Sequence, residues 1–229
     1  MPGDINKADV SITLTPVGPG GPPTPTSCTS SVSSSTKTFT CNFNAVAVNT
    51  YSVVASVTGN YYKGFWEDVV TVYDPSLGFT TGGGTIAWPG TGDKTNFGYT
   101  MKYNKNLTNV QGSLLLIRHL PDGSIYRVKS NSVGGLSIGQ GQDPNVPTGW
   151  ASFTGKATYL QPGWADPVGN YSFIVYVEDR NQPGTGFDRF WLQVKDGGGS
   201  LVGALSISPD GPTNAQGLTG GNIVVPHTR

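Results

Sequence analysis

Three carboxylates flank one loop rich in glycine and proline. Glu178 and Asp179 precede the loop in the stretch VYVEDRNQPGTGFDRFWLQVKD, residues 175–196, and Asp188 follows it. Carboxylates at this spacing can exchange protons with a substrate, hold a calcium ion or shape a turn. The faces of the two flanking strands indicate which of these carboxylates lie together.

Alternation along the two strands aims two of the three carboxylates toward a core. The alternate apolar residues of 173–177 lead directly to Asp179, and those of 190–194 lead back to Asp188. Glu178 falls on the opposite face. Two inward carboxylates cannot stay charged without a partner. We expect loop backbone amides, a basic side chain or a calcium ion to compensate them.

The calcium hypothesis includes two further aspartates. Asp93 in GTGDKTN and Asp166 in WADPVGN lie in other loops that could reach the same end of a sandwich. With Asp179 and Asp188 they would supply the oxygen ligands that calcium prefers. Structural turn chemistry is the competing interpretation, and glycosidase-like chemistry would need a sugar-sized cleft.

Two glycine-rich motifs match enzyme signatures in their letters alone. GLSIG at 135–139 matches a serine nucleophile elbow, and GGGTIA at 82–87 matches a dinucleotide-binding pattern, but no helical segment follows either. Two isolated histidines and two cysteines cannot supply a zinc site. We therefore expect no enzyme, and we interpret the three glycines as a flexible lead-in to a second domain.

Exposed tryptophans are candidates for binding a glycan. Trp164 lies in the loop QPGWADPVGN, and alternation places Trp191 on the polar face of its strand beside Arg189. The competing interpretation is that tryptophans cap the ends of a β-core. Separately, Lys102 in YTMKYN is a candidate strand lysine for an intramolecular isopeptide bond, with a Thr–Gln ester bond as the related alternative.

The composition favours an all-β protein that works outside the cell. Glycine and proline are frequent, with 33 and 17 residues, and suit a chain with many turns. The 14 basic residues balance the 14 acidic ones, so charge gives no reason to expect nucleic acid or an anionic membrane. No apolar run is long enough for a membrane helix. Cys28 and Cys41 predict a local disulfide, which fits an oxidising compartment.

Short alternating segments with turn residues between them predict two tandem β-sandwich domains. We expect a linker over 1–9, a first domain over 10–74 and a larger sandwich or jelly-roll-like domain over 75–229. The segment CTSSVSSSTKTFTCNFNAVAVNTYSVVASVTGNYY resembles the immunoglobulin-like repeats of bacterial secreted and surface proteins, and the resemblance covers about residues 8–74.

The second domain resembles a C-terminal β-sandwich module of bacterial multidomain secreted proteins, through its opening GGG, the strand FGYTMKY and the closing DRFWLQVKD. The resemblance of the first domain implies a stalk or spacer module without catalysis, and that of the second domain implies location and architecture rather than chemistry. We predict a structural and adhesive extracellular module, with calcium as a candidate stabilising ion. Its expected partners are other domains of a longer parent chain and a glycan or cell-surface protein.

Two alternative functions remain open at this point. One is a carbohydrate-binding accessory module of a secreted hydrolase, built on the exposed aromatic residues. The other is a filament subunit, in which the extended segment 1–27 would complete an open sheet edge of a neighbouring copy.

Overall fold

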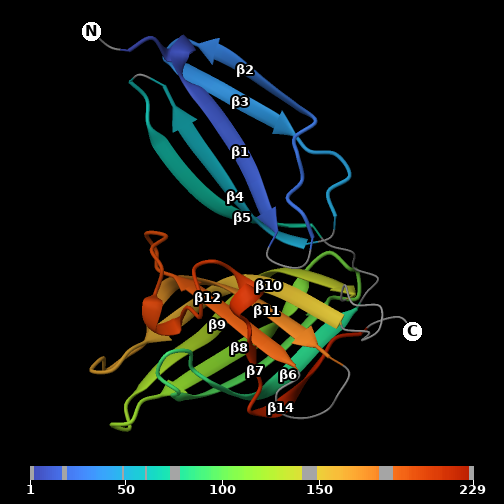
Figure 1. Cartoon of the computed structure of the whole chain (residues 1–229), viewed down its shortest axis with the longest axis vertical. Coiled ribbons are helices and arrows are strands. Elements are labelled where there is room, and N and C mark those ends of the chain that lie inside the picture. The colour runs from blue at the N-terminus through green and yellow to red at the C-terminus, as the bar shows by residue number, and fades with distance from the viewer. Residues whose placement is uncertain are drawn as a thin grey trace. The chain divides into compact units, whose positions relative to one another are not determined.

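The computed structural model of the chain describes residues 3–16, 20–47, 49–59, 61–72, 78–140, 149–180 and 188–226. The described chain is all-β, as predicted, and its helical elements are short 3-10 turns. It divides into two compact units, Met1–Val72 and Tyr73–Arg229, where the sequence placed the boundary after residue 74 (Figure 1). No described helix is long and apolar enough to span a membrane.

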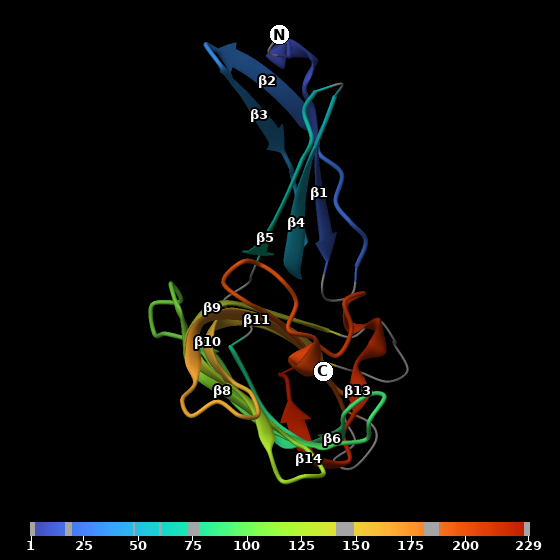
Figure 2. The same cartoon turned by 90° about the vertical axis from the view of Figure 1, so that its left-hand side faces the viewer.

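The first unit combines a three-stranded sheet with a two-stranded hairpin (Figure 2). The sheet has the order β1-β4-β5, with β1 at Asp9–Pro16, β4 at Asn49–Thr58 and β5 at Gly64–Val72. The hairpin consists of β2 (Ser27–Ser33) and β3 (Thr36–Asn42). The inward face of β1 carries Val10, Ile12 and Leu14, of which Leu14 is fully buried, because alternate residues of a strand point to one side.

The first residues of the chain belong to this unit. Ile5–Lys7 form a 3-10 turn, η1, and β1 already begins at Asp9. Lys37 of β3 donates a hydrogen bond to the main-chain oxygen of Ala8 at 2.7 Å. The linker predicted over 1–9 is therefore corrected for its described part. Lys37 lies far from Ala8 in the sequence, so no local sequence pattern predicts this contact.

β1 pairs with β4 of its own chain along its whole length. The register runs from Asp9 opposite Thr58 to Pro16 opposite Tyr51. A strand donated from segment 1–27 to a neighbour would first have to leave this sheet. In the filament hypothesis, pairing with a neighbouring copy would therefore have to replace the hydrogen bonds between β1 and β4.

The second unit is built on one nine-stranded antiparallel sheet that curls until its two halves face each other (Figure 2). Its strands are β6 (Phe79–Ala87), β7 (Lys94–Tyr103), β8 (Val110–His119), β9 (Ile125–Gln140), β10 (Gly149–Leu160), β11 (Val168–Asp179), β12 (Arg189–Lys195), β13 (Gln216–Gly217) and β14 (Gly220–Val224). The order across the sheet is β13-β12-β11-β10-β9-β8-β7-β6-β14.

Side chains from opposite halves of the curled sheet meet in its interior. The Phe97 ring of β7 stacks on the Phe190 ring of β12 with 4.1 Å between centroids. Tyr99, also on β7, approaches Phe153 of β10 at 4.9 Å. The layered core of a sandwich is thus made here by a single continuous sheet, whose inner face is filled by apolar and aromatic residues.

Gly82–Gly84 lie in the middle of β6, which is paired with β7 on one side and β14 on the other. A Cβ atom on Gly82 would lie 2.9 Å from the Tyr99 ring, and one on Gly84 would lie 2.2 Å from the main-chain oxygen of Gly220. The flexible lead-in predicted from these glycines is therefore wrong. Glycine is needed because a ring and a neighbouring strand approach the backbone closely.

The sheet from β6 to β12 is an antiparallel meander, so successive connections alternate between its two ends. The connections 88–93, 120–124 and 161–167 share one end, which we call the turn end. The start of β6 and the end of β11 share the opposite end, which we call the seam end. This division decides which candidate residues can meet.

Candidate functional site

The C-terminal segment that contains β13 and β14 joins the two edges of the curled sheet. β13 pairs with β12 at one edge, and β14 pairs with β6 at the other. Between them the Leu218 N–H donates to the main-chain oxygen of Asp188 at 3.0 Å, and the Thr219 N–H donates to that of Thr85 at 2.7 Å. The segment 216–224 therefore closes the sheet.

Both inward aspartates accept hydrogen bonds from this closing segment or from the residue that follows it. Asp188 Oδ2 accepts from the Ile223 N–H at 2.8 Å, and Asp179 Oδ2 accepts from the Val225 N–H at 2.9 Å. Asp188 Oδ1 accepts from the Arg180 N–H at 3.0 Å. Alternate N–H groups of a strand point to one side, so the carboxylates take the place of a neighbouring strand along the outer edge of β14.

We call Asp179, Asp188, Ile223 and Val225 the carboxylate seam. Asp188 is 1 % exposed. Burial raises the pKa of its carboxyl above the ordinary value, the hydrogen bonds from Arg180 and Ile223 lower it, and the charge of Asp179 raises it further. Backbone amides from the loop and from β14 are the partners shown for Asp188, so the first of the three expected kinds of compensation is present.

Asp93 and Asp166 lie at the turn end, away from the seam. Asp93 is buried and accepts hydrogen bonds from Arg118 Nε at 2.9 Å and Nη2 at 2.6 Å. Hydrogen bonds from the Thr91 hydroxyl and from Arg118 hold the pKa of the Asp93 carboxyl below its ordinary value. Asp166 is exposed in the β10–β11 turn.

The predicted four-aspartate calcium set is therefore corrected, because the meander places its members at opposite ends of the sheet. Asp179 and Asp188 come together, whereas Asp93 and Asp166 are kept away from them by the length of the strands. Within the described ranges, no three His, Cys, Asp or Glu side chains group as metal ligands.

Arg118 uses each of its guanidinium nitrogens in this arrangement. Besides Asp93, it donates to the Ala204 main-chain oxygen through Nη1 at 2.8 Å and to the Thr91 hydroxyl through Nη2 at 3.2 Å. Its guanidinium lies 4.8 Å from the centroid of the Trp88 ring. The pair fastens β8 to the β6–β7 turn and to the 3-10 turn η3 (Gly203–Leu205). Its chemistry is structural.

Glu178 faces away from the seam, as alternation predicts, and has partners of its own. Its carboxylate accepts from Arg180 Nε at 2.7 Å and from the Tyr176 hydroxyl at 2.9 Å. The three carboxylates around the loop therefore separate into two inward side chains that close a sheet and one outward side chain in an ion pair.

The two candidate tryptophans do not form one surface. Trp191 lies opposite Tyr176 in the sheet and is 2 % exposed, so its assignment as an exposed aromatic is wrong. Alternation gives its face correctly but cannot show that both faces of the central strands are covered. Its Nε1 is buried without a hydrogen-bond partner among the described residues. Trp164 lies in the β10–β11 turn and is 37 % exposed.

An aromatic cluster at the turn end was not predicted from the sequence. Tyr126 of β9 and Tyr171 of β11 lie 6.4 and 4.9 Å from the Tyr159 ring of β10, and Trp164 meets the same ring edge-on at 5.6 Å. We call these four residues the tyrosine cluster. Tyr126 and Tyr171 continue the inward stripes of their strands toward the turn end, so the alternation that identified the aspartates could have identified them.

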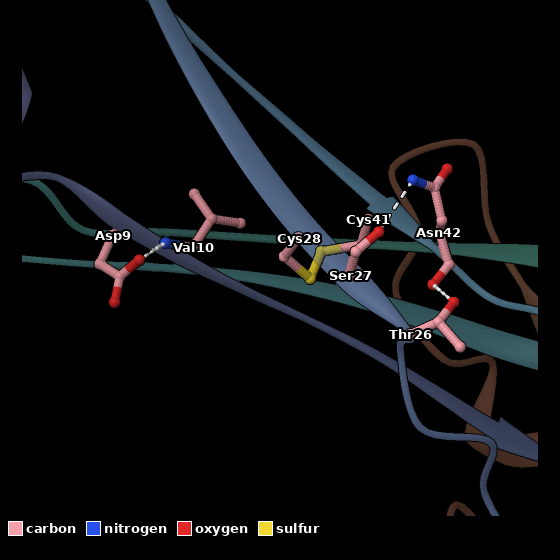
Figure 3. The surroundings of a disulfide bond; sticks show 7 residues. All are labelled: Asp9, Val10, Thr26, Ser27, Cys28, Cys41 and Asn42. Atoms are coloured by element: carbon pink, nitrogen blue, oxygen red, sulfur yellow. Dashed lines mark hydrogen bonds between the residues drawn. A yellow bond between two sulfur atoms is a disulfide. The ribbon is translucent and has the colours of Figure 1, made fainter.

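Cys28 and Cys41 form the predicted disulfide (Figure 3). They face each other across the β2–β3 hairpin with 4.1 Å between Cα atoms. Beside them, the Thr26 hydroxyl donates to the Asn42 main-chain oxygen at 2.9 Å (Figure 3). β2 is exposed along its whole length, so the hairpin gains little from burial and the disulfide supplies the constraint.

The remaining motif residues lie in ordinary strand positions. Ser137 of GLSIG lies inside β9, opposite Ser152, and is buried. A nucleophile elbow would need a strand-to-helix turn there, which this strand does not provide. Lys102 is exposed on β7, so the isopeptide hypothesis lacks the buried environment that such a bond requires.

No family model, curated protein or solved structure matches this chain. The resemblance to immunoglobulin-like repeats therefore stays a prediction from the sequence.

Proposed function

We propose that this chain is a non-catalytic structural module of an extracellular bacterial surface or secreted protein. In this proposal the first unit is a spacer that carries tension, and the second unit presents a surface for binding. The observation that carries the proposal is the arrangement of β1 and β5 on either side of β4.

β1 and β5 both run antiparallel to β4, so they run parallel to each other. The chain enters this sheet at Asp9, opposite Thr58, and leaves it at Val72, opposite Asn49. The entrance and exit are therefore at opposite ends of β4. A force applied through both ends pulls β1 and β5 along their own axes in opposite directions. The hydrogen bonds within each ladder then share the load, because they lie perpendicular to the strands.

The partners of the acidic side chains support a non-catalytic function. Asp188 and Asp179 hold backbone amides of the closing segment, Asp93 holds Arg118, and Glu178 holds Arg180. A general acid or base must exchange its proton with a substrate, which these structural bonds oppose.

The extracellular setting rests on the disulfide and on the hairpin around it. Disulfides persist in oxidising compartments and are rare in the cytosol. The hairpin is rich in serine and threonine, and the bond between Cys28 and Cys41 constrains a segment with little burial. A disulfide that constrains an exposed hairpin suits a module that works outside the cell.

Calcium stabilisation is retained as a proposal for the seam alone, where Asp179 and Asp188 come together. Thermal unfolding of the whole chain in calcium and in chelator tests it. A higher midpoint for the second unit in calcium would support the ion. Equal midpoints would remove it and leave backbone amides as the compensating groups.

Single-molecule stretching tests the spacer proposal through the direction of the load. The chain is pulled once through its two termini and once through the N-terminus and a click-reactive residue introduced at the exposed position Thr58. Asp9 and Thr58 lie opposite each other, so the second geometry opens the β1–β4 ladder one bond at a time. We expect severalfold lower force in that geometry. Equal forces in the two geometries would overturn the spacer proposal.

A further inference from the structure

The tyrosine cluster gathers four aromatic rings from three strands and a turn at the turn end of the second unit. Tyr126, Tyr159 and Tyr171 come from neighbouring strands β9, β10 and β11, and Trp164 comes from the β10–β11 turn. The Trp164 ring stands at 76° to the Tyr159 ring, so Tyr159 contacts it edge-on. Tyr159 itself is buried and forms the floor of the cluster.

The Tyr126 and Tyr171 rings both lie beside the Tyr159 ring. Burial raises the pKa of the Tyr159 hydroxyl to about 12, and the neighbouring Tyr126 and Tyr171 hydroxyls act in the same direction. The Tyr159 hydroxyl makes a long hydrogen bond of 3.4 Å to Gln161 Oε1. For the hydroxyls of Tyr126 and Tyr171, no hydrogen bond to another described residue is found. Each phenol can donate one hydrogen bond and accept others.

The charge beside the cluster is compensated within the protein. Arg118 lies 5.7 Å from the centroid of the Tyr126 ring. Its guanidinium is already bound to Asp93, to the Thr91 hydroxyl and to the Ala204 main-chain oxygen. The guanidinium therefore offers no free positive charge to an anionic ligand. The chemistry left for a ligand consists of aromatic rings, phenol hydroxyls and the exposed Asp166 carboxylate of the same turn.

We propose that the tyrosine cluster binds an uncharged glycan. Sugars combine an apolar C–H face with a rim of hydroxyls, and tyrosine and tryptophan combine an apolar ring with a polar tip. The sugar face would pack on the exposed Trp164 ring, while its hydroxyls would bond to the phenols of Tyr126 and Tyr171. This inference goes beyond the spacer function, because it assigns a ligand to the second unit and does not depend on how the first unit carries load.

The chain also provides a matched aromatic control. Trp66 of β5 is 56 % exposed in the first unit, more than Trp164, but no ring contact between it and a tyrosine is found among the described residues. If exposure of a tryptophan were enough for glycan binding, Trp66 would serve as well as Trp164. The proposal requires Trp164 and not Trp66.

A glycan array probed with the whole chain tests for the ligand class, and titration with the best neutral glycan then tests the site. We expect Trp164→Ala to weaken binding about tenfold or more, consistent with the loss of a stacked aromatic contact. Tyr171→Phe keeps the ring and removes the hydroxyl, and we expect a severalfold loss. Trp66→Ala should leave affinity unchanged.

Three results would overturn the proposal: no neutral glycan bound, only charged glycans bound, or binding that depends on Trp66 and not on Trp164. Circular dichroism checks the fold of each variant. If Trp164→Ala failed to fold, Tyr171→Phe and Tyr126→Phe would decide, and unchanged affinity in both would reject the site. Stretching of the first unit is independent of all these results, so failure here would leave the spacer proposal standing.

Discussion

In the first unit the buried hydrophobic side chains are Ala8, Leu14 and Tyr51, counted over the residues whose side-chain burial the structure describes, which leaves out 49, 50, 52 and 67–71 of its strands. The second unit encloses a continuous cluster that extends from β6 to the segment after β14. Burial of apolar surface contributes roughly 25 cal/mol per Å² to the free energy of unfolding. The second unit is therefore stabilised mainly by its interior. The first depends on its hydrogen-bonded ladders and on the disulfide.

The two units also differ in how their chain ends leave the sheet. In the first unit the chain enters the sheet at one end of β4 and leaves it at the other, so tension slides the outer strands along β4. We call this the shear geometry. In the second unit β6 begins at Phe79 and β14 ends at Val224, and Val224 pairs with Thr81 near that beginning. A force through these ends would peel β14 from β6 bond by bond, starting beside the carboxylate seam.

A large core and strands arranged to resist tension are therefore separate properties of a β-domain. The first unit has little core and a favourable load path. The second has a large core and an unfavourable load path, and side-chain carboxylates reinforce the strand that would leave first. Each prediction below changes one unit and leaves the other as an internal reference.

The largest effect is expected from a core deletion in the second unit. Phe190→Ala removes a ring that stacks on Phe97 in the fully buried interior, and it should lower the free energy of unfolding by about 3–5 kcal/mol. Phe65→Ala is the matched control, because Phe65 in the first unit is 70 % exposed; a change within about 0.5 kcal/mol is expected. Urea unfolding measures both. Similar losses would mean that the two cores are not as unequal as described.

The carboxylate seam should give the next largest effect. Asp188→Ala leaves the Ile223 and Arg180 amides without their acceptor. A buried unsatisfied amide costs about 1–3 kcal/mol, and the partly buried Arg180 amide should cost less than that of Ile223, so we expect about 2–4 kcal/mol in total. Asp166→Ala removes the same carboxylate from an exposed turn and should change little. Hydrogen exchange of the Ile223 amide adds a local measurement. Unchanged protection of that amide in Asp188→Ala would show that the carboxylate does not hold β14.

Removal of the disulfide should destabilise the first unit alone. Replacement of Cys28 and Cys41 by serine frees a loop with a sequence separation of 13, and the loss of its constraint should cost about 2–3 kcal/mol. The transition of the second unit serves as the reference in the same unfolding curve. A shift of that transition would contradict the division of the chain into separately stabilised units.

The smallest effect is the pH dependence of the second unit. The pKa of Asp188 is raised above its ordinary 3.8, so the folded chain binds this proton more tightly than the unfolded chain. The free energy of unfolding should therefore rise as the pH falls from neutral toward 3.8. Asp93 and Asp122 have lowered pKa values, so their contribution is present above 3.8 and is lost below it.

Urea unfolding at several pH values tests this dependence, with Asp188→Ala as the reference. The rise on mild acidification should be present in the wild type and absent in the variant. The same rise in both proteins would assign it to another group.

Local alternation in the sequence predicted much of the arrangement. It placed Asp179 and Asp188 on the inward stripes and Glu178 outside, and the sequence also predicted the all-β class and the pairing of Cys28 with Cys41. These features depend on residues that are neighbours in a strand or hairpin. Period-two patterns carry that information directly.

Features that depend on distant contacts could not be read in the same way. Whether Asp93 and Asp166 share an end with the seam depends on the order of strands across the sheet, which no single hairpin reveals. Gly82–Gly84 are explained by the approach of Tyr99 and β14, both remote in sequence. The closing segment is short and lies far from both of its partner strands, so its pattern alone did not identify it as the element that completes the sheet.

Stretching of the intact chain through its two termini tests the central contrast most directly. The two events can be told apart because unfolding releases about 170 Å of chain from the disulfide-closed first unit and about 500 Å from the second, at roughly 3.5 Å per residue. We expect the short event to occur at the higher force, although the second unit has the larger core. A long event at equal or higher force than the short one would contradict it.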